Sequence, residues 1–130
     1  MLKYLCIFLG GGAGSVCRYL VSALMGHISH TSFPPGTLTV NLIGSFIIGA
    51  LFELFNRFVV PTELRLLLTT GFLGGFTTFS SFALDNTVLY ESSKYYSLLQ
   101  DILVHNIAGI LCVIGGIMLV KILLKRNQLT

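Results

Sequence analysis

The sequence predicts an all-α membrane protein with four transmembrane helices, forming a single transmembrane domain over residues 1–130. Of its 130 residues, 54% are apolar and only 10% are charged, which is too few charges to cover the surface of a soluble domain of this size. A bilayer-spanning helix needs roughly 20 predominantly apolar residues. The chain holds four such stretches end to end, and they leave no room for a separate soluble domain.

The first two spans are predicted at residues 4–25 and 37–55. The first carries one charge, Arg18, and is separated from the second by a polar connection that contains the breaker Pro34-Pro35-Gly36. The N-terminal residues superficially resemble a signal peptide, but the apolar run is too long for one. We therefore interpret it as a retained first helix.

The third span is predicted at residues 63–95, with a break near residues 74–78. Its middle, residues 71–82, reads GFLGGFTTFSSF, and three glycines with four hydroxyl residues make a poor continuous helix. Main-chain groups released from a helix cannot stay unpaired in hydrocarbon, so such a break must be buried in protein or line a cavity. In transport proteins, carbonyls at such breaks coordinate cations, and the N-terminus of the following half-helix favours anions.

The fourth span is predicted at residues 99–123 and contains two adjacent polar residues, His105 and Asn106. Either they form a hydrogen-bonded pair in the core or they line a pore. An even number of spans puts both termini on one side, together with Lys3, Arg57, Arg65, Lys121, Lys125 and Arg126, whereas the other side has Lys94. Taken alone, this bias predicts cytoplasmic termini.

Small and polar residues recur every four positions on the first two spans and form a stripe on each helix. The stripes are Gly10, Gly14, Arg18 and Ser22 on the first span, and Thr37, Asn41, Ser45 and Gly49 on the second. For the glycines, close helix packing is the favoured explanation. Asn41 favours a functional role, because an intramembrane amide needs a partner. Arg18 either snorkels to the nearer interface or anchors a pore mouth.

Phe79 and Phe82 lie three residues apart, on one face of the second half of the third span. They are either ordinary core or lipid-facing aromatics, or rings that present their positive edges to an ion. Edge-on rings beside hydroxyl and amide donors could replace part of the water around a small, hard anion without binding it too tightly.

Several segments match one family when they are taken together. They are Gly10-Gly11-Gly12-Ala13-Gly14 leading to Arg18-Tyr19, Gly36-Thr37, Asn41-Leu42-Ile43-Gly44-Ser45-Phe46 with Gly49, and the whole of residues 71–82. On these residues the chain resembles the CrcB/Fluc fluoride channels along nearly its whole length.

The resemblance implies an antiparallel, dual-topology homodimer with two pores, which passively exports cytoplasmic fluoride through the cell's inner membrane and is not an enzyme. It implies a structural sodium ion on the twofold axis, held by the backbone carbonyls of Gly74 and Thr77. It also implies an anion pathway, to which we add Asn106 because the family's hydroxyl track on the fourth helix is missing here. The pathway residues are then Arg18, Asn41, Phe79, Ser80, Ser81, Phe82 and Asn106.

The glycine pair in the break gives the sodium site a physical rationale. Gly74 and Gly75 permit torsions that other residues reach only with strain. Carbonyls released by such torsions would need a partner, and oxygen ligands suit a hard cation.

Three other classes of protein remain to be weighed. A small multidrug-type cation exporter has the same size and span number but needs a membrane-embedded carboxylate, for which Asp85 and Asp101 are the candidates. An intramembrane enzyme would need a nucleophile and a base, such as Ser80 with His105. A non-transporting scaffold subunit would need none of the polar stripes.

Overall fold

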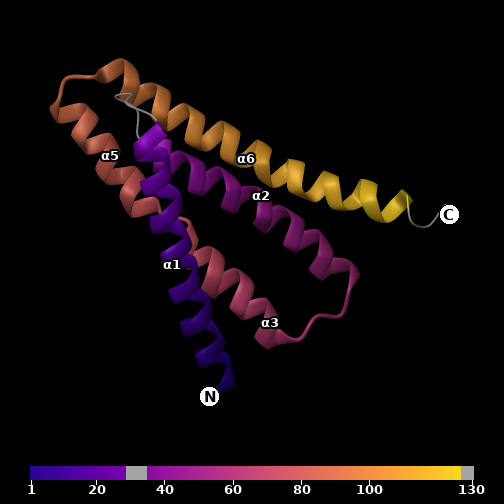
Figure 1. Cartoon of the computed structure of the whole chain (residues 1–130). Helices are drawn as coiled ribbons and strands as arrows, with labels where there is room; N and C mark the ends of the chain where they lie inside the picture. The colour runs from indigo at the N-terminus through magenta and orange to yellow at the C-terminus, as the bar shows by residue number, and fades with distance from the viewer. Residues whose placement is uncertain (29–34, 127–130) are drawn as a thin grey trace.

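The computed structural model describes residues 1–28 and 35–126 (Figure 1), and this part of the chain is almost entirely helical. Four helical runs within it are long and apolar enough to cross a membrane: Leu2–Ile28, Pro35–Arg57, Thr62–Glu91 and Tyr95–Lys125. The protein is therefore a multi-pass membrane protein, as the sequence predicts. Pro34 of the predicted breaker lies outside the described residues.

Three of the four spans are continuous helices: α1 (Leu2–Ile28), α2 (Pro35–Arg57) and α6 (Tyr95–Arg126). Pro35 starts α2, a position that suits proline because its fixed φ fits a helix and its missing N–H would be unpaired there anyway. Each predicted span in this group lies within its helix.

The third span is built from successive segments. They are α3 (Thr62–Leu66), the π-helical segment η1 (Leu67–Leu73), α4 (Gly74–Phe76) and α5 (Phe79–Glu91). Between α4 and α5 the backbone is extended, with φ and ψ of −83° and 158° at Thr77 and of −151° and 115° at Thr78. This two-residue segment is called the interruption below.

The interruption lies at the threonines and not at the glycines. Gly74 has a helical φ of −63°, and no glycine in the described part of the chain has a positive φ. The expectation that Gly74 and Gly75 supply unusual torsions is therefore wrong. Gly75 serves packing, since an added Cβ would collide with the carbonyl of Gly11 on α1.

The boundary between the third and fourth spans also differs from the prediction. Helix α5 ends at Glu91 and not at residue 95, and α6 begins at Tyr95 and not at residue 99. The chain reverses at Ser92 to Lys94, where Ser93 has a left-handed φ of 56° and the Lys94 amide donates to the Leu89 carbonyl at 2.9 Å. The polar run Glu91-Ser92-Ser93-Lys94 marks this turn in the sequence, but the prediction extended the third span past it.

The helices pack as a layer in which α2 lies alongside α6 on one side and against α1 on the other (Figure 1). Helix α1 also packs against η1 and α4, and its glycine stripe makes this approach possible. A Cβ at Gly10 or Gly14 would collide with main-chain atoms of Leu67 or Phe72. Gly49 of α2 meets the Val113 carbonyl of α6 in the same way. The packing explanation of these glycines is confirmed.

The buried core is small for a chain of this length. Val40 and Asp101 are fully buried, whereas large apolar side chains along every span are exposed. Exposed apolar faces of this extent suit contact with lipid or with further protein.

Candidate functional site

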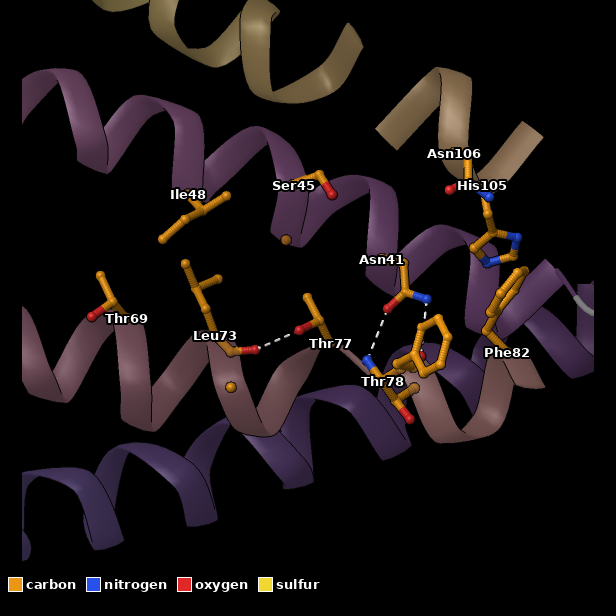
Figure 2. Close-up of a pocket in the computed structure, with 13 residues that line it drawn as sticks. Asn41, Ser45, Ile48, Thr69, Leu73, Thr77, Thr78, Phe82, His105 and Asn106 are labelled. Atoms are coloured by element: carbon orange, nitrogen blue, oxygen red, sulfur yellow. Dashed lines mark hydrogen bonds between the residues drawn. The ribbon is translucent and has the colours of Figure 1, made fainter. Parts of the chain in front are cut away.

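A pocket of about 430 Å³ opens between α2, the third span and the first half of α6 (Figure 2). Its wall combines apolar and aromatic side chains with hydroxyl, amide and imidazole groups. The lining residues are Asn41, Gly44, Ser45 and Ile48 of α2; Thr69, Leu73, Gly74, Thr77, Thr78, Phe79 and Phe82 of the third span; and His105 and Asn106 of α6.

The side chain of Asn41 holds the interruption in place. Its Nδ2 donates to the Thr78 carbonyl at 3.1 Å, and its Oδ1 accepts from the Thr78 amide at 2.8 Å (Figure 2). In a continuous helix that amide would donate to the carbonyl of Gly74, four residues earlier. Asn41 therefore has the partner that the sequence analysis required, and the Gly74 carbonyl is released from its helical bond.

Thr78 also caps the helix that follows. Its Oγ1 accepts from the Ser81 amide at 3.1 Å and lies 3.1 Å from the hydroxyls of both Ser80 and Ser81. A threonine in extended conformation is a favoured N-cap, because its hydroxyl pairs an otherwise free amide of the first turn. The positive end of the α5 dipole is thus fixed beside the pocket.

Arg18 of α1 reaches the other residue of the interruption. Its Nη1 lies 3.5 Å from the Thr77 carbonyl, while Thr77 Oγ1 donates to the Leu73 carbonyl at 2.9 Å. The guanidinium is thereby tied to the protein interior at the depth of the interruption. A side chain that only snorkelled to the membrane interface would not make this contact with the main chain of another helix.

Three aromatic rings follow one another from the start of α5 to α6. The ring centroids of Phe79 and Phe82 are 5.5 Å apart with an interplanar angle of 49°, and those of Phe82 and His105 are 4.5 Å apart with the same angle. Phe79 is 78% exposed, so its ring is open to a neighbour outside this chain. Rings tilted in this way present edges as well as faces to one another.

A buried polar cluster lies behind His105. Asn86 of α5 donates to Asp101 Oδ2 at 2.7 Å, and His105 Nδ1 lies 3.0 Å from Asp101 Oδ1. Asp85, the other candidate carboxylate, accepts from the Thr37 hydroxyl of α2 at 2.7 Å. Both carboxylates are thus engaged by neighbouring helices.

The structure gathers most of the residues predicted for the anion and sodium sites around one pocket. Asn41, Gly74, Thr77, Phe79, Phe82 and Asn106 line it. Ser80 and Ser81 do not line it but bond to Thr78 behind it, and Arg18 contacts the interruption from the side of α1. Ser80 bonds to Thr78, and in the part of the chain that the structure describes no hydrogen bond joins Ser80 to His105, as a nucleophile and base would require.

Several lining residues were not among the predicted sites. Thr78 has a signal in the sequence, since threonine is a favoured N-cap residue just before a helical run. Ser45 lies on the predicted α2 stripe. Thr69 has no such signal in the sequence. It belongs to the π-helical segment η1, and a π-helical turn is not recognisable from composition.

Comparison with known proteins agrees with this architecture. Residues 5–117 match the family described as CrcB-like protein, Camphor Resistance (CrcB). A protein of Maridesulfovibrio salexigens named Fluoride-specific ion channel FluC is 43% identical over 96% of this chain and 100% of its own length. Proteins of the same name from Legionella pneumophila (strain Lens) and Gloeothece citriformis are 40% and 44% identical, over 96% and 93% of this chain and 94% and 98% of their own lengths. The chain therefore belongs to the CrcB family.

Proposed function

We propose that this protein is a fluoride channel. The observation that carries the proposal is the near full-length similarity to proteins named Fluoride-specific ion channel FluC. The pocket at the interruption supports it, because the residues that carry the resemblance meet there. The alternative of a cation exporter is not favoured, since Asp101, the buried carboxylate it would use, is held by Asn86 and His105.

The chemistry of the pocket suits a small anion. The positive end of α5, the hydroxyl of Ser45 and the second N–H of the Asn106 amide provide donors, and Phe79 and Phe82 provide ring edges. Such groups replace hydration water at several weak sites in sequence, which allows an ion both to enter and to leave. Passive flow through them would export fluoride from the cytoplasm across the inner membrane.

We further propose that two antiparallel copies assemble. Phe79 and Gly74 are exposed at the interruption, so each could meet a second subunit. The charge bias that predicts a single orientation is weakened by internal contacts. Arg57 and Lys121 lie 2.6 Å and 3.9 Å from Glu53 carboxylate oxygens, and Arg65 donates to the Phe55 carbonyl at 2.7 Å.

A structural sodium ion between the subunits is the finer part of this proposal. The released carbonyl of Gly74 fits a sodium ligand, and a twofold axis would double the number of such oxygens. The Thr77 carbonyl fits less well in one subunit, because the Arg18 guanidinium already contacts it. Because the sodium ligands would be main-chain oxygens, the backbone conformation of the interruption should matter more for sodium binding than the Thr77 side chain does.

Purified protein in liposomes tests the proposed function. Fluoride should leave rapidly and chloride hardly at all, and fluoride flux should persist without a sodium gradient, because a structural ion is not transported. Phe82→Leu should slow fluoride efflux by up to about tenfold, which corresponds to the ~1.5 kcal/mol of an aromatic contact. Ion-selective electrodes measure both rates.

Phe58→Leu is the matched control, since Phe58 lies after α2 and outside the pocket lining. Comparable fluoride and chloride rates would contradict the channel assignment. A strict need for a sodium gradient would show instead that sodium is cotransported.

A further inference from the structure

The ring of Phe82, which lines the pocket, lies against the imidazole ring of His105 (Figure 2). The two ring centroids are 4.5 Å apart with an interplanar angle of 49°, so each ring limits how the other can turn. Among the described residues, the other aromatic neighbour of Phe82 is Phe79, whose ring is 78% exposed and therefore restrains Phe82 less. The orientation of the Phe82 ring thus depends on where His105 is held.

His105 is held by Asp101, one turn earlier on α6. Its Nδ1 lies 3.1 Å from the main-chain carbonyl of Asp101 and 3.0 Å from the carboxylate oxygen Oδ1. The carbonyl is an acceptor, so Nδ1 carries a hydrogen and donates to it. The other ring nitrogen, Nε2, is buried and has no hydrogen-bond partner among the described residues. Within this part of the chain, Asp101 therefore provides the polar contacts that orient the imidazole.

Asn86 of α5 completes the link back to Phe82. Its Nδ2 donates to Asp101 Oδ2 at 2.7 Å and to the main-chain carbonyl of Phe82 at 2.9 Å. Phe82 is thus held twice, at its ring by His105 and at its carbonyl by Asn86, and Asp101 joins the two. Asn86, Asp101 and His105 are together called the α5–α6 clamp below.

The α5–α6 clamp is polar and buried, although it lies in membrane spans. Asp101 is fully buried, Asn86 is 8% exposed and the His105 side chain is 7% exposed. Ionisable side chains inside a membrane span are costly, and they are usually found where they serve a function. Well-packed apolar side chains would join two helices at lower cost. Helix packing alone therefore does not explain the clamp.

Helix α5 depends on the clamp because it has few other neighbours in the chain. Among the described residues it packs chiefly against α6 and only slightly against α2, where Thr37 donates to Asp85 at 2.7 Å. Phe82 lies in the first turn of α5, between the interruption and Asn86. Loss of the clamp would therefore release the Phe82 ring while the bonds of the interruption itself remain.

We propose that Asn86, Asp101 and His105 are positioning residues for fluoride conduction, which hold the Phe82 ring in the orientation in which it meets the anion. This inference rests on the proposed fluoride channel function. It goes beyond that function by assigning a role to three buried residues that act through Phe82 and do not bind the ion. The sequence left His105 open between a core pair and a pore lining, and here a core contact serves the pathway.

The test is a double-mutant cycle on fluoride efflux from liposomes, with equal amounts of monodisperse protein so that loss of folded protein does not count as slow conduction. His105→Leu should slow efflux about threefold or more, as expected for residues coupled by direct contact. In a Phe82→Leu background the same change should have almost no further effect, because the ring that it positions is gone. His105→Phe, which keeps a ring against Phe82, should conduct faster than His105→Leu.

Asn86→Leu tests the other end of the clamp, and it replaces His105→Leu in the cycle if that variant does not fold. It should slow efflux in the wild-type background and not in the Phe82→Leu background. Thr87→Val is the matched control on α5. The exposed Thr87 hydroxyl also donates to a carbonyl four residues earlier, that of Ala83 at 3.0 Å, but outside the clamp, so this variant should keep wild-type efflux.

Slowing by the same factor in both backgrounds would overturn the inference, since the clamp would then act independently of the Phe82 ring. Wild-type efflux from His105→Leu and Asn86→Leu, with only a lower melting temperature, would show a purely structural role and overturn it equally. Wild-type efflux from Phe82→Leu would do the same. No fluoride efflux from the wild-type protein would contradict the channel function itself, a result distinguishable from all of these.

Discussion

Asn41 shows how one side chain can restore hydrogen bonds that an interrupted helix loses. Its amide accepts from the Thr78 N–H and donates to the Thr78 carbonyl, at 2.8 Å and 3.1 Å. Glutamine or aspartate would not serve equally, because the first is longer and the second lacks the donor. The residue is thus a structural brace that also lines the pocket.

Asn41→Ala should lower the free energy of unfolding by about 1 to 3 kcal/mol, because the Thr78 amide is left unpaired in a dry environment. Thr39→Ala is the control on the same helix, since that hydroxyl donates only to the Pro35 carbonyl within α2. Thermal unfolding in detergent measures both. Equal stability of the two variants would show that the brace is unimportant.

The need of Asn41 for a partner could be predicted from the sequence, whereas the identity of that partner could not. An amide in a membrane span is costly unless paired, and this holds for any fold. Thr78 is 37 residues away, and only the packing of two helices brings it within reach. The bond from Asn86 of α5 to Asp101 of α6 was missed for the same reason, since these residues lie on different helices.

At the scale of elements, the third span owes its shape to a π-helical segment as well as to the interruption. In η1 the Gly74 amide donates to the Thr69 carbonyl, five residues earlier. The wider turn lets α1 approach η1 and α4 at Gly10 and Gly14. The sequence predicted a break here from glycines and hydroxyls, but its composition does not distinguish a π-helical turn from an α-helical one.

Gly14→Ala should lower the thermal stability of the protein, since its Cβ would collide with the Phe72 carbonyl and overpacking costs about 1 to 3 kcal/mol. Gly12→Ala, two residues away on α1, meets nothing within 4 Å and should be neutral or stabilise by up to about 1 kcal/mol. Melting temperatures of the purified variants decide the matter. A destabilising Gly12→Ala with a harmless Gly14→Ala would contradict the described packing of α1.

At the scale of the whole molecule, one chain provides a pocket but few fully buried side chains. The exposed Phe79 ring and the released Gly74 carbonyl both lie at the interruption, on a surface that lipid suits poorly because a carbonyl needs a partner there. A second copy of the chain would cover both. This is why the proposed dimer and the proposed sodium ion are linked.

The antiparallel arrangement predicts that every loop is found on both sides of the membrane. Val59, in the α2 to α3 connection, and Ser92, in the α5 to α6 turn, lie at opposite ends of the third span. With Cys6, Cys17 and Cys112 replaced by serine, Val59→Cys and Ser92→Cys should each react with impermeant thiol reagent from inside and outside in comparable amounts. Labelling of each from one side alone would establish a single orientation.

The dependence of Thr78 on Asn41 also bears on how the chain enters the bilayer. Alone in lipid, the third span would carry an unpaired amide at Thr78, and hydrocarbon offers nothing to satisfy it. Helix α2 precedes this span in the chain, so the brace is synthesised before the group that needs it. The third span is therefore suited to insertion beside a helix already in place, and the order of synthesis becomes part of how the interruption is tolerated.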